Sequence, residues 1–206
     1  PDLIYRVQKG LRLGVFGDFR ARHEEGSQIF PDEGTLALGV HGEWDTRDKL
    51  INTRRGDFFQ LELSREAKDG AFSQVKLDLR RFVRLKRDWT WANRLMAGTS
   101  LGQPSYLFRY SLGGLDLLRG YKSNRFRGRE YFVFQEELRW IWTRWLSLNS
   151  SVDIGGIRDE AYHQLKASVQ VGLRVGLPPD WGQKMRVDVG VGADQMTAQV
   201  QFGEVF

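Results

Sequence analysis

Arginine and glycine are concentrated in one stretch of the sequence, between Ser111 and Glu130, and this stretch holds the residues most able to do chemistry. Its Arg-Gly steps offer guanidinium groups, which bind carboxylates or phosphates through paired hydrogen bonds. Arg-Gly segments that bind RNA work as repeats in disordered tails, whereas this stretch lies between aromatic, strand-like segments. We therefore predict no nucleic-acid partner. A solvated surface loop and a segment packed inside the protein both stay open from these residues alone.

The residue types used in catalysis do not form a recognisable active site. His23, His41 and His163 are far apart in the sequence and lack metal-ligand spacing. The chain has no cysteine, which excludes a disulfide scaffold and a thiolate metal site. Glu136 and Glu137 are adjacent, so on a strand they point to opposite faces. We therefore predict a protein that is not an enzyme and that uses no cofactor and no metal.

The composition is that of a single domain without a membrane-spanning helix. The chain has 206 residues, and 31 Lys and Arg against 26 Asp and Glu give a net charge of +5 that is spread along the sequence. Mean hydropathy is −0.46, and no apolar run approaches the ~18 residues of a spanning helix. A transmembrane β-barrel has the same polar average, because lipid-facing and lumen-facing residues alternate. The seven tryptophans are compatible with aromatic girdles at membrane interfaces.

Apolar and polar residues alternate with a period of two along most of the chain, which indicates β-strands. Clear examples are residues 34–44, 73–85, 135–142 and 187–192. Turn residues separate the strands at 67–70, 86–88, 177–183 and 192–195. We count roughly ten strands, many of them longer than the ~5–6 residues usual in globular sheets. Long strands with short turns predict an all-β fold, an antiparallel up-and-down β-barrel.

This alternation fits a soluble barrel with its charges outward as well as a membrane barrel with its charges around a wet lumen. Strand length near the ~9–11 residues that span a bilayer favours the membrane. So does the last segment, which alternates through Phe202 and ends on Phe206. A terminal aromatic residue on an amphipathic strand is characteristic of bacterial outer-membrane barrels. We therefore expect a transmembrane barrel in a lipid bilayer, and a soluble ligand-binding barrel is the less favoured alternative.

In this order, the segments resemble the C-terminal barrel of the BamA/TamA-like bacterial surface-antigen superfamily. Residues 44–56 are similar to its Asp-x-Arg-Asp…Pro-x-x-Gly connector, with Thr53 in place of Pro. Residues 110–128 are similar to its long extracellular loop, Gly-Gly-x-x-x-(Val/Leu)-Arg-Gly-(Phe/Tyr) followed by an Arg/Phe/Gly segment. Residues 134–140 resemble its Glu-Leu-Arg strand, and residues 151–156 its Phe-x-Asp-x-Gly motif.

The resemblance implies a function in the outer membrane of a Gram-negative bacterium. The barrel would insert or translocate proteins, with a client polypeptide and the outer-membrane assembly machinery as partners. The family barrel has sixteen strands, so we expect residues 1–206 to be the C-terminal portion of such a barrel. The alternative is a structural anchor or translocator for a passenger domain, for example a patatin-like lipase.

We expect the loop at 102–129 to fold back into the lumen. Strand parity places Glu137 and Asp153 on the inner wall, where the guanidinium of Arg119 can reach them. Gly155 would leave space for the incoming side chain, and the resemblance implies the same contact between Arg119 and Asp153. The expected loop motif is Gly113, Gly114, Leu118, Arg119, Gly120, Tyr121, Phe126, Arg127 and Gly128. Its expected partners on the wall are Glu137, Arg139, Asp153 and Gly155, and Phe202 and Phe206 form the expected C-terminal assembly signal.

Overall fold

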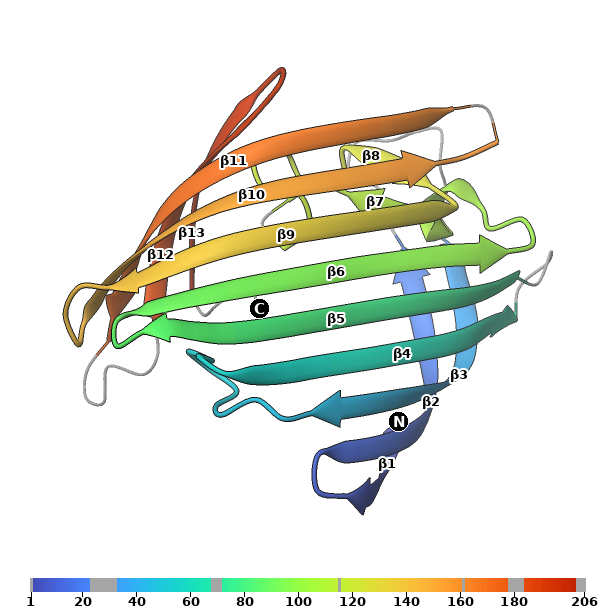
Figure 1. The fold of residues 1–206 in the computed structure, drawn as a ribbon. Helices are drawn as coiled ribbons and strands as arrows, with labels where there is room; N and C mark the ends of the chain where they lie inside the picture. The colour runs from blue at the N-terminus through green and yellow to red at the C-terminus, as the bar shows by residue number, and fades with distance from the viewer. Residues whose placement is uncertain are drawn as a thin grey trace.

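The protein is an antiparallel β-sheet protein, and the strands of its large sheet lie side by side in the order in which they occur along the chain (Figure 1). The computed structural model describes residues 2–22, 33–67, 72–114, 116–160, 162–177 and 184–202. Eleven strands form the large sheet: β1 (Asp2–Gln8), β2 (Leu11–Arg22), β3 (Glu33–Asp45), β4 (Gly56–Ala67), β5 (Phe72–Lys86), β6 (Trp89–Leu101), β9 (Glu130–Ile141), β10 (Leu146–Arg158), β11 (His163–Gly176), β12 (Lys184–Gly192) and β13 (Met196–Phe202). The predicted all-β fold is confirmed.

The large sheet is strongly curved (Figure 1) but does not close on itself within the described residues. β1 and β13 are its two edges, and each has one hydrogen-bonded neighbour there. The predicted turns at 86–88 and 192–195 lie between strands as expected, whereas those at 67–70 and 177–183 fall mostly outside the described residues. Among the described residues, no helix has the length and apolar character needed to span a bilayer.

The loop predicted at 102–129 lies between the end of β6 and the start of β9. It contains a short 3₁₀ turn, η1 (Tyr106–Phe108), and two short strands, β7 (Tyr110–Leu112) and β8 (Phe126–Gly128). These two strands pair with each other as a separate two-stranded sheet. Figure 1 places this small sheet beside β9 and β10.

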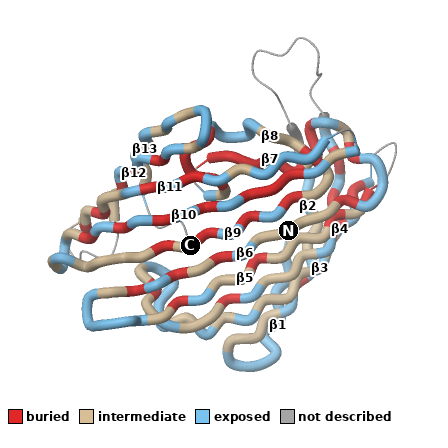
Figure 2. The backbone as a smooth tube through the Cα atoms, turned by 45° about the horizontal axis from the view of Figure 1, so that its top comes forward, coloured by how far each residue is buried: buried red, intermediate tan, exposed pale blue. Residues whose placement is uncertain are grey.

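The two faces of the large sheet differ in the sense expected for a membrane barrel. Figure 2 shows buried and exposed residues alternating along β9 and β10. The exposed positions are apolar, as at Phe134 and Val152, whereas the intervening buried positions are polar, as at Glu137 and Asp153. A soluble protein buries its apolar face instead. The polar face is therefore the lumen side, and the apolar face is the side that meets lipid.

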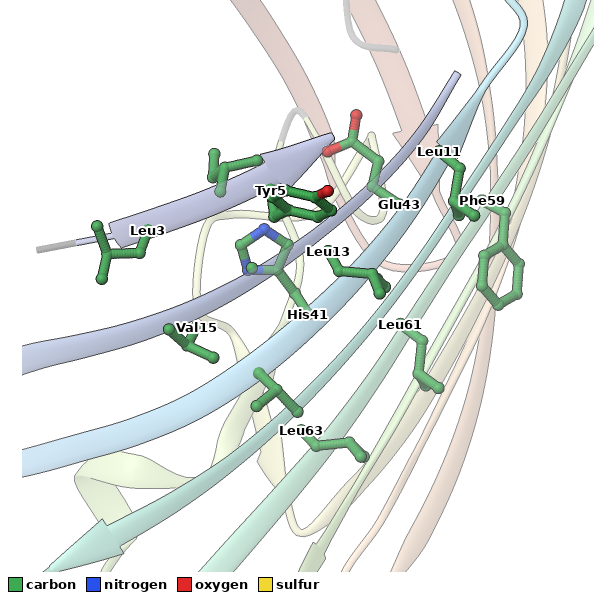
Figure 3. A pocket seen from close by; sticks show the side chains of 14 residues that line it. Leu3, Tyr5, Leu11, Leu13, Val15, His41, Glu43, Phe59, Leu61 and Leu63 are labelled. Atoms are coloured by element: carbon green, nitrogen blue, oxygen red, sulfur yellow. The ribbon is translucent and has the colours of Figure 1, made fainter. Parts of the chain in front are cut away.

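A hollow on the apolar side lies over β1 to β4 (Figure 3). Its lining includes Leu13, Val15, Leu61 and Leu63, which occupy the outward positions of their strands, together with Tyr5 of β1. Most of the lining residues are apolar, and His41 and Glu43 of β3 supply an imidazole and a carboxylate (Figure 3). The lining fits the lipid-facing surface and offers little for the recognition of a polar ligand.

Tryptophan rings gather on one end of the sheet, which we call the short-turn end because the β5–β6 and β9–β10 turns lie there. The rings of Trp89 and Trp140 stack with centroids 5.6 Å apart, and those of Trp140 and Trp142 stack at 6.0 Å. Trp142 is 61% exposed. Trp89 and Trp140 are half-buried. Stacked indoles at one edge of an apolar face are the pattern of an interfacial girdle.

Four polar residues interrupt the apolar face in a row across neighbouring strands. Asp57, Arg81, Asn93 and Glu136 are successive partners in the registers of β4, β5, β6 and β9. The side chain of Arg81 is 72% exposed and lies 3.9 Å from Asp57. The indole of Trp91 donates a hydrogen bond to Glu136 at 2.8 Å. The positive charge of Arg81 is therefore partly neutralised by Asp57, and the carboxylate of Glu136 has a hydrogen-bond donor.

Candidate functional site

The long loop packs onto the polar face of the sheet and builds an apolar core there. Buried side chains of the loop pack against buried side chains of β9 and β10 in one cluster. The cluster consists of Tyr110, Leu112, Leu118, Tyr121, Tyr131, Val133 and Ile157. Burial of each large apolar side chain contributes ~1.5–3 kcal/mol. These contacts anchor the loop to the wall independently of its charges.

Arg119 lies at the centre of the loop's polar contacts and is only 2% exposed. Its Nε donates to Oδ2 of Asp153 at 2.8 Å, and its Nη2 donates to Oδ1 of the same carboxylate. The backbone N–H of Arg119 also donates to Asp153 Oδ2, at 3.0 Å. Its Nη1 donates to Glu137 Oε2 at 2.7 Å. The contact predicted between Arg119 and Asp153, with Glu137 nearby, is present in the structure.

The charges around Arg119 are balanced although they are buried. The side chains of Glu137 and Asp153 are each 1% exposed, so either carboxylate would be very unfavourable without a cation. Arg139 donates through Nε to Glu137 Oε1 at 2.6 Å, so it supports the loop through Glu137. Asn149 also donates to Glu137, at 3.4 Å. Arg174 lies 4.0 Å from Glu137 as well. Removal of Arg119 would leave the buried carboxylate of Asp153 without the cation that it contacts.

Glycines let the loop reverse its direction on both sides of Arg119. Gly113 has φ of +114° and Gly120 has φ of +95°, in the left-handed region that other residues avoid. A Cβ atom at Gly113 would lie 2.3 Å from the carbonyl oxygen of Lys122. The N–H of Gly114 donates to the carbonyl of Tyr121 at 3.0 Å and closes the turn.

The loop meets the backbone of β12 at two glycines that the sequence analysis did not select. A Cβ atom at Gly190 would lie 2.5 Å from the backbone nitrogen of Gly120, and one at Gly192 would lie 2.5 Å from the ring of Tyr121. A signal for this contact exists in the sequence. Gly190 and Gly192 occupy successive inward positions of a strand whose outward positions are valines, so they leave a bare patch on the lumen side.

Tyr121 fills this patch and is fully buried. Its hydroxyl donates to the carbonyl of Ala167 on β11 at 3.2 Å and accepts from the backbone N–H of Ala193 at 3.0 Å. Its ring packs edge-on against Phe126, with centroids 5.5 Å apart. Tyr121 therefore ties the loop to β11 and to the end of β12, as its predicted packing on the wall requires.

Three further residues of the predicted site, Arg127, Gly128 and Gly155, each make a different contact. Arg127 donates to the carbonyl of Leu107 at 3.3 Å, a contact within the loop. A Cβ atom at Gly128 would lie 2.6 Å from the carbonyl oxygen of Arg158, so the loop passes close to β10. A Cβ atom at Gly155 would lie 3.1 Å from Leu112. The space at Gly155 is therefore filled by a leucine side chain of the loop, while the guanidinium of Arg119 lies against Asp153.

The predicted C-terminal signal is described only in part. Phe202 ends β13 opposite Met185 and is exposed on the apolar side. Phe206 lies outside the described residues.

The connector at residues 46–55, between β3 and β4, is held by its own hydrogen bonds. The carboxylate of Asp48 accepts the backbone N–H groups of Arg54 at 3.0 Å and Arg55 at 3.4 Å. Thr53, which replaces the expected proline, is buried and donates its hydroxyl to the carbonyl of Lys49 at 2.7 Å. This bond provides a local restraint at the position where proline would otherwise restrict the backbone.

A curved antiparallel sheet with an apolar outer face, a polar inner face and a long loop anchored inside defines the class of outer-membrane β-barrel proteins. Within that class, a family model described as the Omp85 superfamily domain matches residues 30–203, and the chain belongs to this superfamily. Omp85 domains are outer-membrane proteins of Gram-negative bacteria that act in protein insertion or translocation. No curated protein matches the chain. The family resemblance seen in the sequence is confirmed at the level of the superfamily.

Proposed function

We propose that this protein is the barrel of an outer-membrane insertase or translocase in which Arg119, Glu137 and Asp153 form a latch for the long loop. The latch, as we call these three residues, holds the loop in the conformation that handles client polypeptides. The protein would be integral to the outer membrane and would work with the assembly machinery there. It would use neither a cofactor nor a catalytic residue, and residues 1–206 would form the C-terminal portion of its barrel.

The observation that carries the proposal is the burial of the latch charges. A buried ion pair adds little net stability, because desolvation offsets much of the attraction. The loop already has an apolar anchor in Leu112, Leu118 and Tyr121. A second, ionic anchor at Arg119 is therefore better explained by selection of one loop conformation than by a need for stability.

The edges of the sheet support a role in handling extended polypeptides. Among the described residues, β1 and β13 each present one edge without a strand partner. Such an edge carries a row of backbone donors and acceptors, to which an extended segment can add as a further strand. Within lipid these groups must be paired. We infer that other strands of the complete barrel or a strand of the client cover them.

The test is an insertion assay with the full-length protein in liposomes. An unfolded outer-membrane barrel is added as client, and the rate at which it becomes protease-resistant is measured. We expect the protein to raise this rate, and Arg119→Ala or Asp153→Ala to return it close to the rate in protein-free liposomes. Arg81→Gln is the matched control and should retain the wild-type rate, because the exposed side chain of Arg81 lies on the outer face of the sheet, opposite the face that carries the latch.

The same assay also distinguishes the proposed role from the alternative role. A structural anchor or translocator for a passenger domain, such as a patatin-like lipase, would not accelerate the insertion of an added client. No acceleration by the wild-type protein, together with display of its own passenger domain at the cell surface, would therefore replace the proposal by the alternative.

A further inference from the structure

A second charged site lies on the lumen side at the short-turn end of the sheet. It is a cavity of about 230 Å³ bounded by the 46–55 connector and by strands β6 and β9 to β12. Its positively charged lining residues are Lys49, Arg54, Arg139, Arg144, Arg174 and Lys184. Among the lining residues that the structure describes, none is acidic.

The walls of the cavity bring cations and neutral hydrogen-bonding groups together from separate elements. Thr90, Asn149 and Arg174 occupy inward positions on β6, β10 and β11. Lys184, at the start of β12, donates to the hydroxyl of Ser147 at 2.9 Å. The connector adds Lys49 and Arg54. Convergence of these elements makes the positive charge a property of the fold and not of one flexible segment.

Carboxylates that compensate part of the positive charge lie behind the wall and not in the lining of the cavity. Arg139 contacts Glu137 at 2.6 Å, and Arg174 contacts Asp188 at 2.6 Å. Asp48 and Asp88 act on Arg54 in the same way. None of these four carboxylates lines the cavity itself. Glu137 also serves Arg119, so its charge is shared.

The surroundings of Arg54, and one further arginine behind the lining, add to the electrostatics of the cavity. Burial lowers the pKa of Arg54 from its usual value, and the nearby positive charge of Arg84 lowers it further, whereas the carboxylates of Asp88 and Asp48 act in the opposite direction. Arg186, on β12, is the register partner of Arg174 and is 1% exposed. Its Nε lies 3.1 Å from Asp188 Oδ2, whereas its Nη2 has no hydrogen-bond acceptor among the described residues. An additional anion in this region would lower the electrostatic energy of the whole group.

We propose that this cavity binds a small anion that carries a phosphate group. Phosphate oxygens accept several charge-assisted hydrogen bonds, and guanidinium groups match their geometry. A recessed site lined by one sign of charge also concentrates counter-ions. The volume is below the ~300–1,000 Å³ of pockets for drug-sized ligands, which favours a phosphate or pyrophosphate group over a polypeptide segment. This inference does not depend on the proposed function.

Titration calorimetry on the full-length protein in detergent, at low ionic strength, tests the proposal with inorganic pyrophosphate as the probe. We expect saturable binding that is weakened at least tenfold in the Arg54→Gln/Lys184→Gln double variant. The variant Arg81→Gln removes one positive charge from the outer face of the sheet, opposite the face that carries the cavity, and should bind like the wild type. Lys184→Gln alone, which changes the end of one strand, serves as a second variant if the double variant does not fold.

Two further ligands distinguish the source of the phosphate and the class of ligand. Tighter binding of pyrophosphate than of a soluble short-chain phosphatidic acid would identify a free anion, and the reverse order would identify a lipid headgroup. Both results support a phosphate site. The proposal is overturned if neither ligand binds saturably, if the Arg54→Gln/Lys184→Gln variant binds as the wild type does, or if a glutamate-rich peptide binds more tightly than either phosphate compound.

Discussion

The carboxylate of Asp153 accepts hydrogen bonds from three nitrogens of Arg119, one in the backbone and two in the guanidinium group. A single side chain on the wall therefore fixes both the side chain and the main chain of the loop residue. This distinguishes the contact from an ordinary ion pair, which would constrain the charged group alone. The position of the loop depends on the geometry of the contact as well as on its charge.

The first prediction concerns this pair. Arg119→Ala and Asp153→Ala should each leave a folded sheet but release the loop, at a cost of about 3–5 kcal/mol, because each leaves a buried charge without its partner. The double variant should be little less stable than either single variant, since both changes remove one interaction. Denaturant unfolding in detergent gives the three free energies, and hydrogen exchange over residues 110–128 reports on the loop.

Arg119→Lys is the informative control for this prediction. It keeps the positive charge but cannot form the paired contact with the carboxylate, so it should recover only part of the loop protection. Fully additive losses in the double variant would show that Arg119 and Asp153 do not act as a unit.

The second prediction concerns the glycine patch on β12. Gly190→Ala should displace the loop, because its Cβ atom would lie 2.5 Å from the backbone nitrogen of Gly120, which cannot move aside as a flexible side chain would. We expect destabilisation of ~1–3 kcal/mol, the usual range for overpacking, with faster proteolysis of the loop. The matched control is Gly42→Ala, where the nearest atom is a side-chain methyl of Leu13 at 3.4 Å. Equal sensitivity of the two variants to protease would contradict this role for Gly190.

The third prediction concerns the tryptophan girdle. Trp140 and Trp142 should contact lipid near the membrane surface, since they lie at the short-turn end of the apolar face. Lipids brominated near the headgroup should quench their fluorescence more strongly than lipids brominated near the bilayer centre. Comparison with the Trp140→Phe/Trp142→Phe variant isolates the contribution of these two indoles. A detergent-free, monodisperse monomer would contradict the membrane assignment altogether.

The fourth prediction concerns the C-terminal residue. Deletion of Phe206 should slow assembly into membranes more than it lowers the stability of the assembled protein, because a single terminal aromatic residue contributes at most ~1.5–3 kcal/mol by burial. The rate at which the protein becomes resistant to unfolding in cold detergent measures assembly, and the denaturant midpoint measures stability. Equal assembly rates with and without Phe206 would exclude a role as a signal.

The strands and the direction of their side chains could be predicted because alternation is a local property of the chain. Leu138 and Trp140 on one face, with Glu137 and Arg139 on the other, settle the parity of β9 without knowledge of its neighbours. The partner of Arg119 followed from the same parity, applied to Asp153, together with the family resemblance.

The glycine patch and the cationic cavity could not be predicted in this way. Gly190 becomes significant only when β12 lies under a loop that is 70 residues earlier in the sequence, and no local pattern encodes that contact. Lys49 and Arg54 enter the cavity from a connector that has no periodicity. Their positions depend on hydrogen bonds to Asp48 and Thr53, which are visible only in three dimensions.

The contact between Tyr121 and Ala193 has a consequence for the order in which the protein assembles. Seventy-two positions separate the two residues, and the strands β9 to β12 lie between them in the chain. The loop is therefore synthesised before its docking surface exists, and Arg119 must stay hydrated until β9 and β10 have paired. Closing so long a segment is slow, since its entropy is lost before the distant contact forms. Seating of the loop is thus a late checkpoint, and a chain that lacks β12 would lack the surface on which Gly120 and Tyr121 pack.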